Sequence, residues 1–172
     1  MTIHIFNARK VADDISKNVI SPKEKSYYLL GTFLLFIPFY YSGFVYTNPL
    51  WSWLSIYEAI VVTFITVVGL NKTYEAAGAD SNQNFVTEFT CLYVPVSITT
   101  ISLVWLSYWG IGYTFRESLI KLSSSHLEIA VKLSNIGSNL FGLLIFLASV
   151  LIPFITFYRI KKLFHVIQRN RG

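Results

Sequence analysis

The fold of this chain is decided by its long apolar stretches, and the last of them, residues 137–158, runs GSNLFGLLIFLASVLIPFITFY. Residues 27–46, 50–70 and 85–113 are also long and apolar. About 20 helical residues cross the roughly 30 Å hydrocarbon core of a bilayer. Because lipid offers the backbone no hydrogen-bond partner, each stretch must be a helix. The sequence therefore predicts an all-α, polytopic membrane protein with four transmembrane helices and short amphipathic surface helices.

The composition agrees with a membrane-embedded class of protein. Hydrophobic residues make up 53% of the 172 residues and charged residues 13%, whereas an ordinary soluble domain has about 25% charged residues. The aromatic content is 17%, and Tyr and Trp favour the headgroup level of a bilayer. The length leaves room for one small bundle. We expect a cytoplasmic amphipathic segment over residues 1–21, a transmembrane domain over 22–158 and a basic cytoplasmic tail over 159–172.

The distribution of basic residues predicts the orientation. Five precede the first apolar stretch, five follow the last, and only Lys72 lies in the second connection. The third connection carries Arg116, Lys121 and Lys132, and the first carries none. With both termini inside, eleven basic residues are cytoplasmic and three are external. The positive-inside rule selects this arrangement, which requires an even number of spans. We expect a multi-pass protein of the bacterial inner membrane with both termini in the cytoplasm.

Two helix starts are visible near the N-terminus. Residues 8–19 place apolar side chains at helical spacing, with Asn7 as a cap, and predict an amphipathic helix that is interfacial or docks a partner. Its apolar residues are Val11, Ala12, Ile15 and Val19. Ser21 and Glu24 form a capping box around Pro22, which predicts that the first transmembrane helix begins there.

The segment 115–135 is ambiguous. Residues 127–133 alternate between apolar and polar, as in a strand, whereas Ser125 followed by Glu128 is typical of a helix start. A lone strand beside a membrane would leave its edges unpaired. We therefore favour a separate helix lying on the outer surface. Residues 71–84 lack apolar periodicity and predict a cytoplasmic loop.

Glu58 is the strongest individual candidate for a functional side chain. It lies about 12 Å inside the second apolar stretch, where an ionisable group costs about 2.5–3.5 kcal/mol to insert. Ser55 and Thr63 add polar groups to the same helix, and Thr100 belongs to a hydroxyl-rich part of the third stretch. Two interpretations remain open for Glu58. It forms a proton or ion site, or it is a protonated carboxyl that fixes helix packing.

Other polar and small residues predict contacts rather than chemistry. Ser138 and Gly142 form a small-xxx-small pair beside Asn139, which favours close helix packing within one chain or between copies. The basic tail favours anionic lipid or a protein partner over nucleic acid because it follows a membrane span. Its residues are Arg159, Lys161, Lys162, Arg169 and Arg171. Apolar residues between them suggest a short amphipathic helix on the cytoplasmic surface.

No sequence pattern points to catalysis or a cofactor. His4, His126 and His165 are scattered without ligand spacing, and no phosphate loop, nucleophile elbow or HExxH motif occurs. We therefore expect a non-enzymatic protein without a metal or cofactor. The first hypothesis is a membrane sensor or scaffold that forms homo-oligomers and signals to a cytoplasmic partner. The alternative is a small oligomeric ion channel or transporter that uses Glu58.

One resemblance bears on the process. Gly78-Ala79-Asp80 is followed by Asn84-Phe85-Val86-Thr87-Glu88-Phe89 and Pro95-Val96-Ser97-Ile98. These residues look like the start of the third span in small bacterial four-span proteins. The plan of the whole chain is similar to the membrane subunit of the Kiwa anti-phage system. This resemblance implies an oligomeric inner-membrane sensor that reports phage attack to a cytoplasmic, DNA-associated effector.

Overall fold

The computed structural model describes residues 4–42, 49–123 and 127–171 and is helical throughout, with no β-strand in these ranges. Its elements are α1 (Ala8–Ser16), α2 (Pro22–Ser42), α3 (Pro49–Ala76), the 3-10 helix η1 (Ala79–Ser81), α4 (Phe85–Ser123) and α5 (Leu127–Arg171). The prediction of an all-α protein is confirmed. Among the described residues, three helices contain segments apolar and long enough to cross a membrane, namely Ile56–Ala76, Phe85–Leu122 and Gly142–Arg171. The remaining predicted stretch, 27–46, falls partly outside the described residues.

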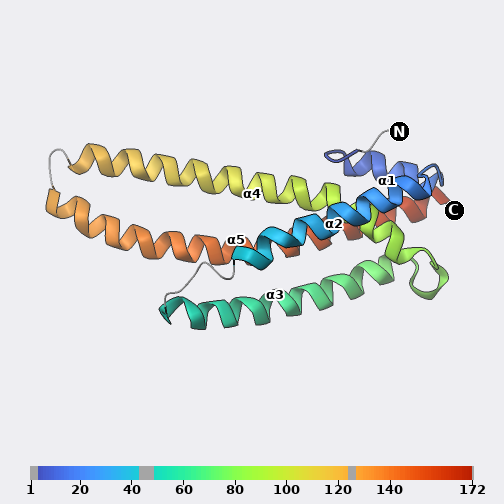
Figure 1. The fold of residues 1–172 in the computed structure, drawn as a ribbon, viewed down its shortest axis with the longest axis horizontal. Helices are drawn as coiled ribbons and strands as arrows, with labels where there is room; N and C mark the ends of the chain where they lie inside the picture. The colour runs from blue at the N-terminus through green and yellow to red at the C-terminus, as the bar shows by residue number, and fades with distance from the viewer. Residues whose placement is uncertain (1–3, 43–48, 124–126, 172) are drawn as a thin grey trace.

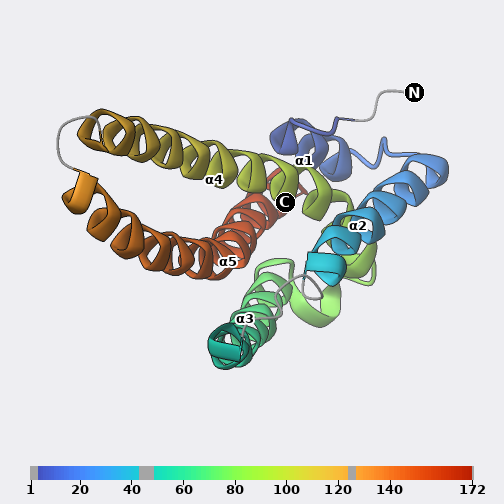
Figure 2. The same ribbon diagram turned by 60° about the vertical axis from the view of Figure 1, so that its left-hand side comes forward.

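The helices from α2 to α5 alternate in direction along one long axis (Figure 1). α4 and α5 form an antiparallel hairpin, α3 packs on α5, and α2 packs on α4. Two views agree that α5 lies between α3 and α4 (Figures 1 and 2). Residues 89–115 of α4 and 133–158 of α5 carry no charged side chain. Each of these uncharged segments is about 40 Å long at helical rise, enough to cross the hydrocarbon core.

The best-packed part of the molecule lies at one end of this bundle. There α1 rests on α4 and α5, beside the start of α2 and the end of α3 (Figure 1). We call its buried apolar cluster the terminal core; it consists of Ala8, Val11, Ala12, Ile15, Tyr28, Ala76, Ala77, Cys91, Leu92, Val94, Val96, Ile160, Phe164 and Ile167. Away from the terminal core, α3 and the middle of α5 expose large apolar side chains. A bilayer or further copies of the chain would cover such surfaces.

The helix starts follow the local sequence. The Lys10 N–H donates to Asn7 Oδ1 at 3.1 Å, so Asn7 caps α1 as predicted. The capping box before α2 is also confirmed, because the Ser21 N–H donates to Glu24 Oε2 at 3.0 Å and the Glu24 N–H donates to Ser21 Oγ at 3.3 Å. The predicted extent of α1 is wrong at its end. The helix stops at Ser16, and Val19 is exposed rather than part of the apolar face.

Two further expectations about surface helices are wrong. Residues 115–135 do not form a separate helix, because α4 continues to Ser123 and α5 begins at Leu127. The basic tail is likewise the last part of α5 and not a short helix of its own. The physical reason is the same in both places. No Gly or Pro lies between Gly112 and Ser123 in α4 or between Pro153 and Arg171 in α5, so α4 continues past residue 115 and α5 past residue 159.

Candidate functional site

A buried carboxylate joins three segments of the chain at the terminal core. Glu88, in the first turn of α4, is almost fully buried and accepts a hydrogen bond from Arg171 Nη2 at 2.6 Å. Its other oxygen accepts from Asn82 Nδ2 at 2.9 Å, in the loop before α4. The Arg171 guanidinium also donates to the carbonyl oxygen of Ile15 at 3.4 Å. The end of α5 is therefore tied to α1 and to the start of α4 through one charge pair.

A second basic residue of α5 binds the hydroxyl groups of α4. Arg159 Nη1 donates to Thr99 Oγ1 and to Thr100 Oγ1, both at 2.9 Å. Thr100 is buried, and its hydroxyl in turn donates to the carbonyl oxygen of Val96 at 2.8 Å. Arg159 is the first charged residue after the uncharged segment of α5. Its contacts therefore join α4 and α5 at the level where the uncharged segment of α5 ends.

Aromatic rings pack the three long helices together beside these polar contacts. The Phe85 ring of α4 lies between Tyr74 of α3 and Phe164 of α5, with centroid distances of 5.1 and 5.6 Å. Phe89 stacks on Phe157 of α5 at 6.1 Å. Such pairs contribute about 0.5–1.5 kcal/mol each beyond their area burial. Any movement of α5 relative to α3 and α4 at this end must rearrange this cluster.

The loop between α3 and α4 is fixed by polar contacts at both ends. Tyr74 OH donates to Asp80 Oδ1 at 2.5 Å, and Gln168 Nε2 of α5 donates to the carbonyl oxygen of Ala77. Gly78 has φ of 98°, a left-handed conformation that favours glycine. The loop is shorter than the predicted 71–84, because α3 runs to Ala76. The Gln168 contact holds the loop against the end of α5.

The outer surface of this end is basic. Within α1, Lys10 pairs with Asp14 at 3.0 Å and Lys17 with Asp13 at 2.9 Å. The Lys17 ammonium lowers the pKa of Asp13, and the Asp14 carboxylate raises the pKa of Lys10. These pairs balance charge locally. Further exposed basic residues lie around them, namely Arg9, Lys23, Lys162 and Arg169, so the surface offers positive charge to a partner or an anionic lipid.

The predicted intramembrane polar residues do not gather in one place. Glu58 is half-buried in the apolar part of α3, and Thr63 on the same helix is exposed. Thr100 lies on α4, on the other side of α5, in contact with Arg159 (Figure 1). The side chain of Ser55 lies outside the described residues. The structure therefore brings Thr100 to the basic residues of α5 and not to Glu58.

Close helix contacts occur at glycines that the sequence did not single out. A Cβ on Gly69 of α3 would lie 2.5 Å from the Phe157 ring of α5, and one on Gly137 would collide with the Phe115 ring of α4. Gly142 is buried as the small-xxx-small pattern predicts, whereas the side chains of Ser138 and Asn139 lie outside the described residues. An aromatic residue opposite a glycine is visible only once the helix register is known.

These observations define a class: a helical protein with membrane-compatible long helices and, at one end, an apolar core that is tied by hydrogen bonds and has a basic surface. Comparisons with protein-family models, with curated proteins and with solved structures find no match for this chain.

Proposed function

We propose that this chain is a non-enzymatic, oligomeric sensor or scaffold of the bacterial inner membrane that signals to a cytoplasmic protein. In this proposal α2 to α5 cross the membrane and the terminal core lies in the cytoplasm. The observation that carries it is the continuity of α4 and α5. Each runs unbroken from the far end of the bundle into the terminal core, over about 58 and 67 Å at helical rise.

The path of the chain supports four crossings. α1 and the end of α3 meet at the terminal core, and α3 places Pro49 about 40 Å away at helical rise. The segment between α1 and Pro49 must therefore cover this distance, and α2 with residues 43–48 is long enough to do so. If α3 spans the bilayer, α2 spans it as well. The basic residues around the terminal core then lie on the cytoplasmic side, as the positive-inside rule requires.

A signal can pass through this arrangement by rigid-body motion. Because α4 and α5 are continuous helices, a tilt or slide at the far end moves their other ends in the terminal core. At that end the motion would strain or break the Glu88–Arg171 pair and the Arg159 contacts with Thr99 and Thr100. Both sets of contacts join α5 to its neighbours. A change in them alters how α1 and the basic surface are presented to a partner.

The resemblance to the Kiwa membrane subunit supports anti-phage defence as the process. The exposed basic residues at this end fit a partner with an acidic surface. Exposed apolar faces on α3 and α5 leave room for homo-oligomeric contacts within the membrane. No nucleic acid or cofactor is part of the proposal.

The test is purification of the tagged protein from its native membranes in mild detergent, followed by mass photometry and identification of co-purifying chains. We expect a defined homo-oligomer that carries a cytoplasmic protein in fixed stoichiometry. Charge reversal at the terminal core, Lys162→Glu with Arg169→Glu, should release the partner and keep the oligomer. Arg116→Glu is the matched control, because this exposed residue lies at the far end of α4.

A homo-oligomer without any partner would contradict the sensor proposal. It would favour the channel alternative, in which Glu58 lies on the permeation path. Planar-bilayer recordings of the wild type and Glu58→Gln then separate the two, since only a channel gives a conductance that this substitution changes.

A further inference from the structure

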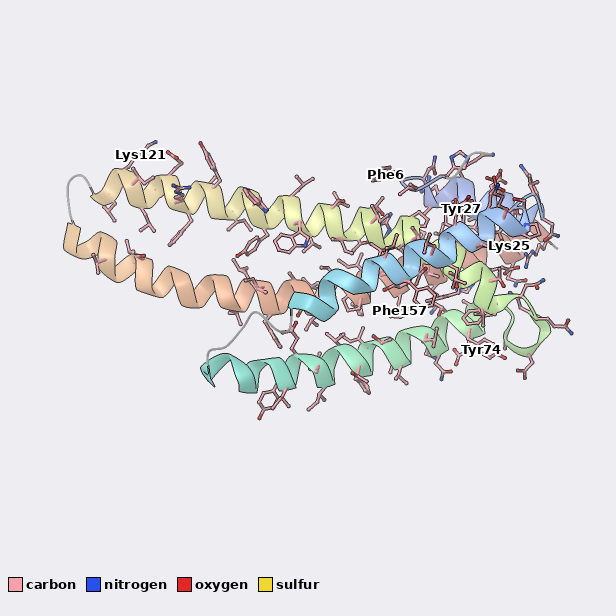
Figure 3. The ribbon with its side chains drawn as sticks, viewed as in Figure 1. Phe6, Lys25, Tyr27, Tyr74, Lys121 and Phe157 are labelled. Carbon is pink, nitrogen blue, oxygen red and sulfur yellow. The ribbon has the colours of Figure 1, made fainter. Side chains whose placement is uncertain are left out.

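A groove between α3 and α5 opens at the edge of the terminal core. It has a volume of about 280 Å³, and its walls are mainly apolar. Phe64 and Val68 line it from α3, and Phe154 and Phe157 line it from α5. Phe157 lies between the two helices (Figure 3), and its ring packs against Gly69 within the groove. Its polar lining is concentrated in two lysines, Lys72 and Lys161.

The two lysines lie at the same level of the bundle. Lys72 is the first charged residue after Glu58 in α3. Lys161 lies two residues after Arg159, which is the first charged residue after the uncharged segment of α5. Lys72 Nζ pairs with Glu75 Oε2 at 3.1 Å, but both side chains are more than half exposed. Such a pair contributes little and leaves the ammonium able to turn toward another anion. One end of an apolar groove is thus cationic at the level where headgroups would lie.

We propose that this groove binds one anionic phospholipid. An acyl chain would lie along Phe64, Val68 and Phe154, and the phosphate would sit between the ammonium groups of Lys72 and Lys161. Tyr158, which also lines the groove, has an apolar ring and a polar hydroxyl that suit the boundary between chain and headgroup. Basic pockets between transmembrane helices on the cytoplasmic side bind such headgroups. The inference requires the helices to be in a membrane, but it does not require the signalling role.

The test measures lipid binding to the purified oligomer by native mass spectrometry in dodecyl maltoside. Dioleoylphosphatidylglycerol is the anionic probe and dioleoylphosphatidylcholine is the neutral reference. We expect phosphatidylglycerol to bind more tightly. Lys72→Gln and Lys161→Gln should each weaken its binding about fivefold, since one basic residue near a headgroup contributes about 1 kcal/mol. The matched control is Lys162→Gln, which removes the same charge one residue away and outside the groove.

A second pair of variants tests the apolar part without changing any charge. Val68→Trp would fill the groove, whereas Val67→Trp adds the same bulk on the neighbouring exposed residue, which does not line it. We expect Val68→Trp to abolish tight binding of phosphatidylglycerol and Val67→Trp to leave it within twofold of the wild type. Both valines are at least 40% exposed, at 42% and 62%, so neither change disturbs the terminal core.

Three results would overturn the proposal. Equal binding of the two lipids would show that the lysines do not select an anion. Equal losses in Lys161→Gln and Lys162→Gln would show general attraction to a basic surface and no specific groove. An altered oligomer in Val68→Trp with unchanged lipid preference would assign the groove to a second copy of the chain. Selective lipid binding by a wild-type oligomer that carries no cytoplasmic partner would contradict the sensor role and leave this inference standing.

Discussion

The Arg159 guanidinium donates to the hydroxyl groups of Thr99 and Thr100. Removal of the guanidinium and removal of the hydroxyls have different consequences. Thr99 and Thr100 already donate to backbone carbonyl oxygens of their own helix. Removal of the guanidinium therefore leaves no unsatisfied hydroxyl donor. Removal of the hydroxyls instead leaves a half-buried guanidinium without its acceptors. Unmade hydrogen bonds of a charged group cost more than those of a neutral one.

We therefore predict an asymmetry in stability. Thr99→Val with Thr100→Val should destabilise the protein by about 1–2 kcal/mol, whereas Arg159→Met should change the free energy of unfolding by less than about 0.5 kcal/mol. Thermal unfolding in detergent measures both. A larger loss in Arg159→Met would show that the guanidinium stabilises α4 and α5 through contacts beyond these hydroxyls.

The Glu88–Arg171 pair is buried on one side only, with side-chain exposures of 8% for Glu88 and 27% for Arg171. Arg171→Ala leaves a buried carboxylate with only Asn82 as a described partner, and we expect it to cost about 1–3 kcal/mol. Arg169→Ala is the control because it removes the same charge two residues earlier in α5. The double variant Glu88→Gln with Arg171→Ala should lose less than the sum of the single variants. Strict additivity would show that the two charges do not interact.

At the level of elements, Gly69 sets the distance between α3 and α5. Gly69→Ala would place a methyl group 2.5 Å from the Phe157 ring, close to the ring's attachment, so the helices must move apart. We expect a loss of about 1–3 kcal/mol in the free energy of unfolding, as for other overpacked contacts. Gly110→Ala is the control, because its Cβ would meet nothing within 4 Å. Equal thermal midpoints for the two variants would contradict a tight α3–α5 contact.

α1 illustrates how an element can depend on the rest of the fold. Nine residues are too few for a stable isolated helix in water, even with the Asn7 cap. Its apolar face, Ala8, Val11, Ala12 and Ile15, is buried against α4 and α5. The sequence predicted this face correctly except for Val19. It left open whether a membrane surface or a protein covers it, and the structure assigns it to the chain's own helices.

For the whole molecule, the proposed topology makes a prediction that can be tested by labelling. In a Cys91→Ala background, Arg116→Cys should react with a membrane-impermeant maleimide in intact spheroplasts. Lys162→Cys should react only after permeabilisation. Both positions are exposed, and they lie at opposite ends of the uncharged helical segments. Labelling of both from the same side would contradict the four-span arrangement.

Local sequence features specify the helices and the starts of α1 and α2, and in the described residues they make three helices long and apolar enough to cross a membrane. Long uncharged apolar stretches predict helices, and Asn7, Ser21 and Glu24 mark where α1 and α2 begin. These are local properties, so residues within one or two turns are enough to specify them. The same local rules did not predict that α4 and α5 include the segments expected to form separate surface helices. Surface helices were expected at 115–135 and 159–171, but residues 115–123 belong to α4 and residues 127–135 and 159–171 belong to α5.

The residues that meet across the bundle follow from how the helices pack and not from local sequence. Arg159 lies 59 residues from Thr100, and Arg171 lies 83 residues from Glu88. Their contacts depend on the register of the antiparallel α4–α5 hairpin, and a helical sequence does not encode that register locally. The groove between α3 and α5 has the same origin, because residues of both helices line it and their register brings Gly69 against Phe157. Helices follow from short-range chemistry, whereas sites between them follow from long-range packing.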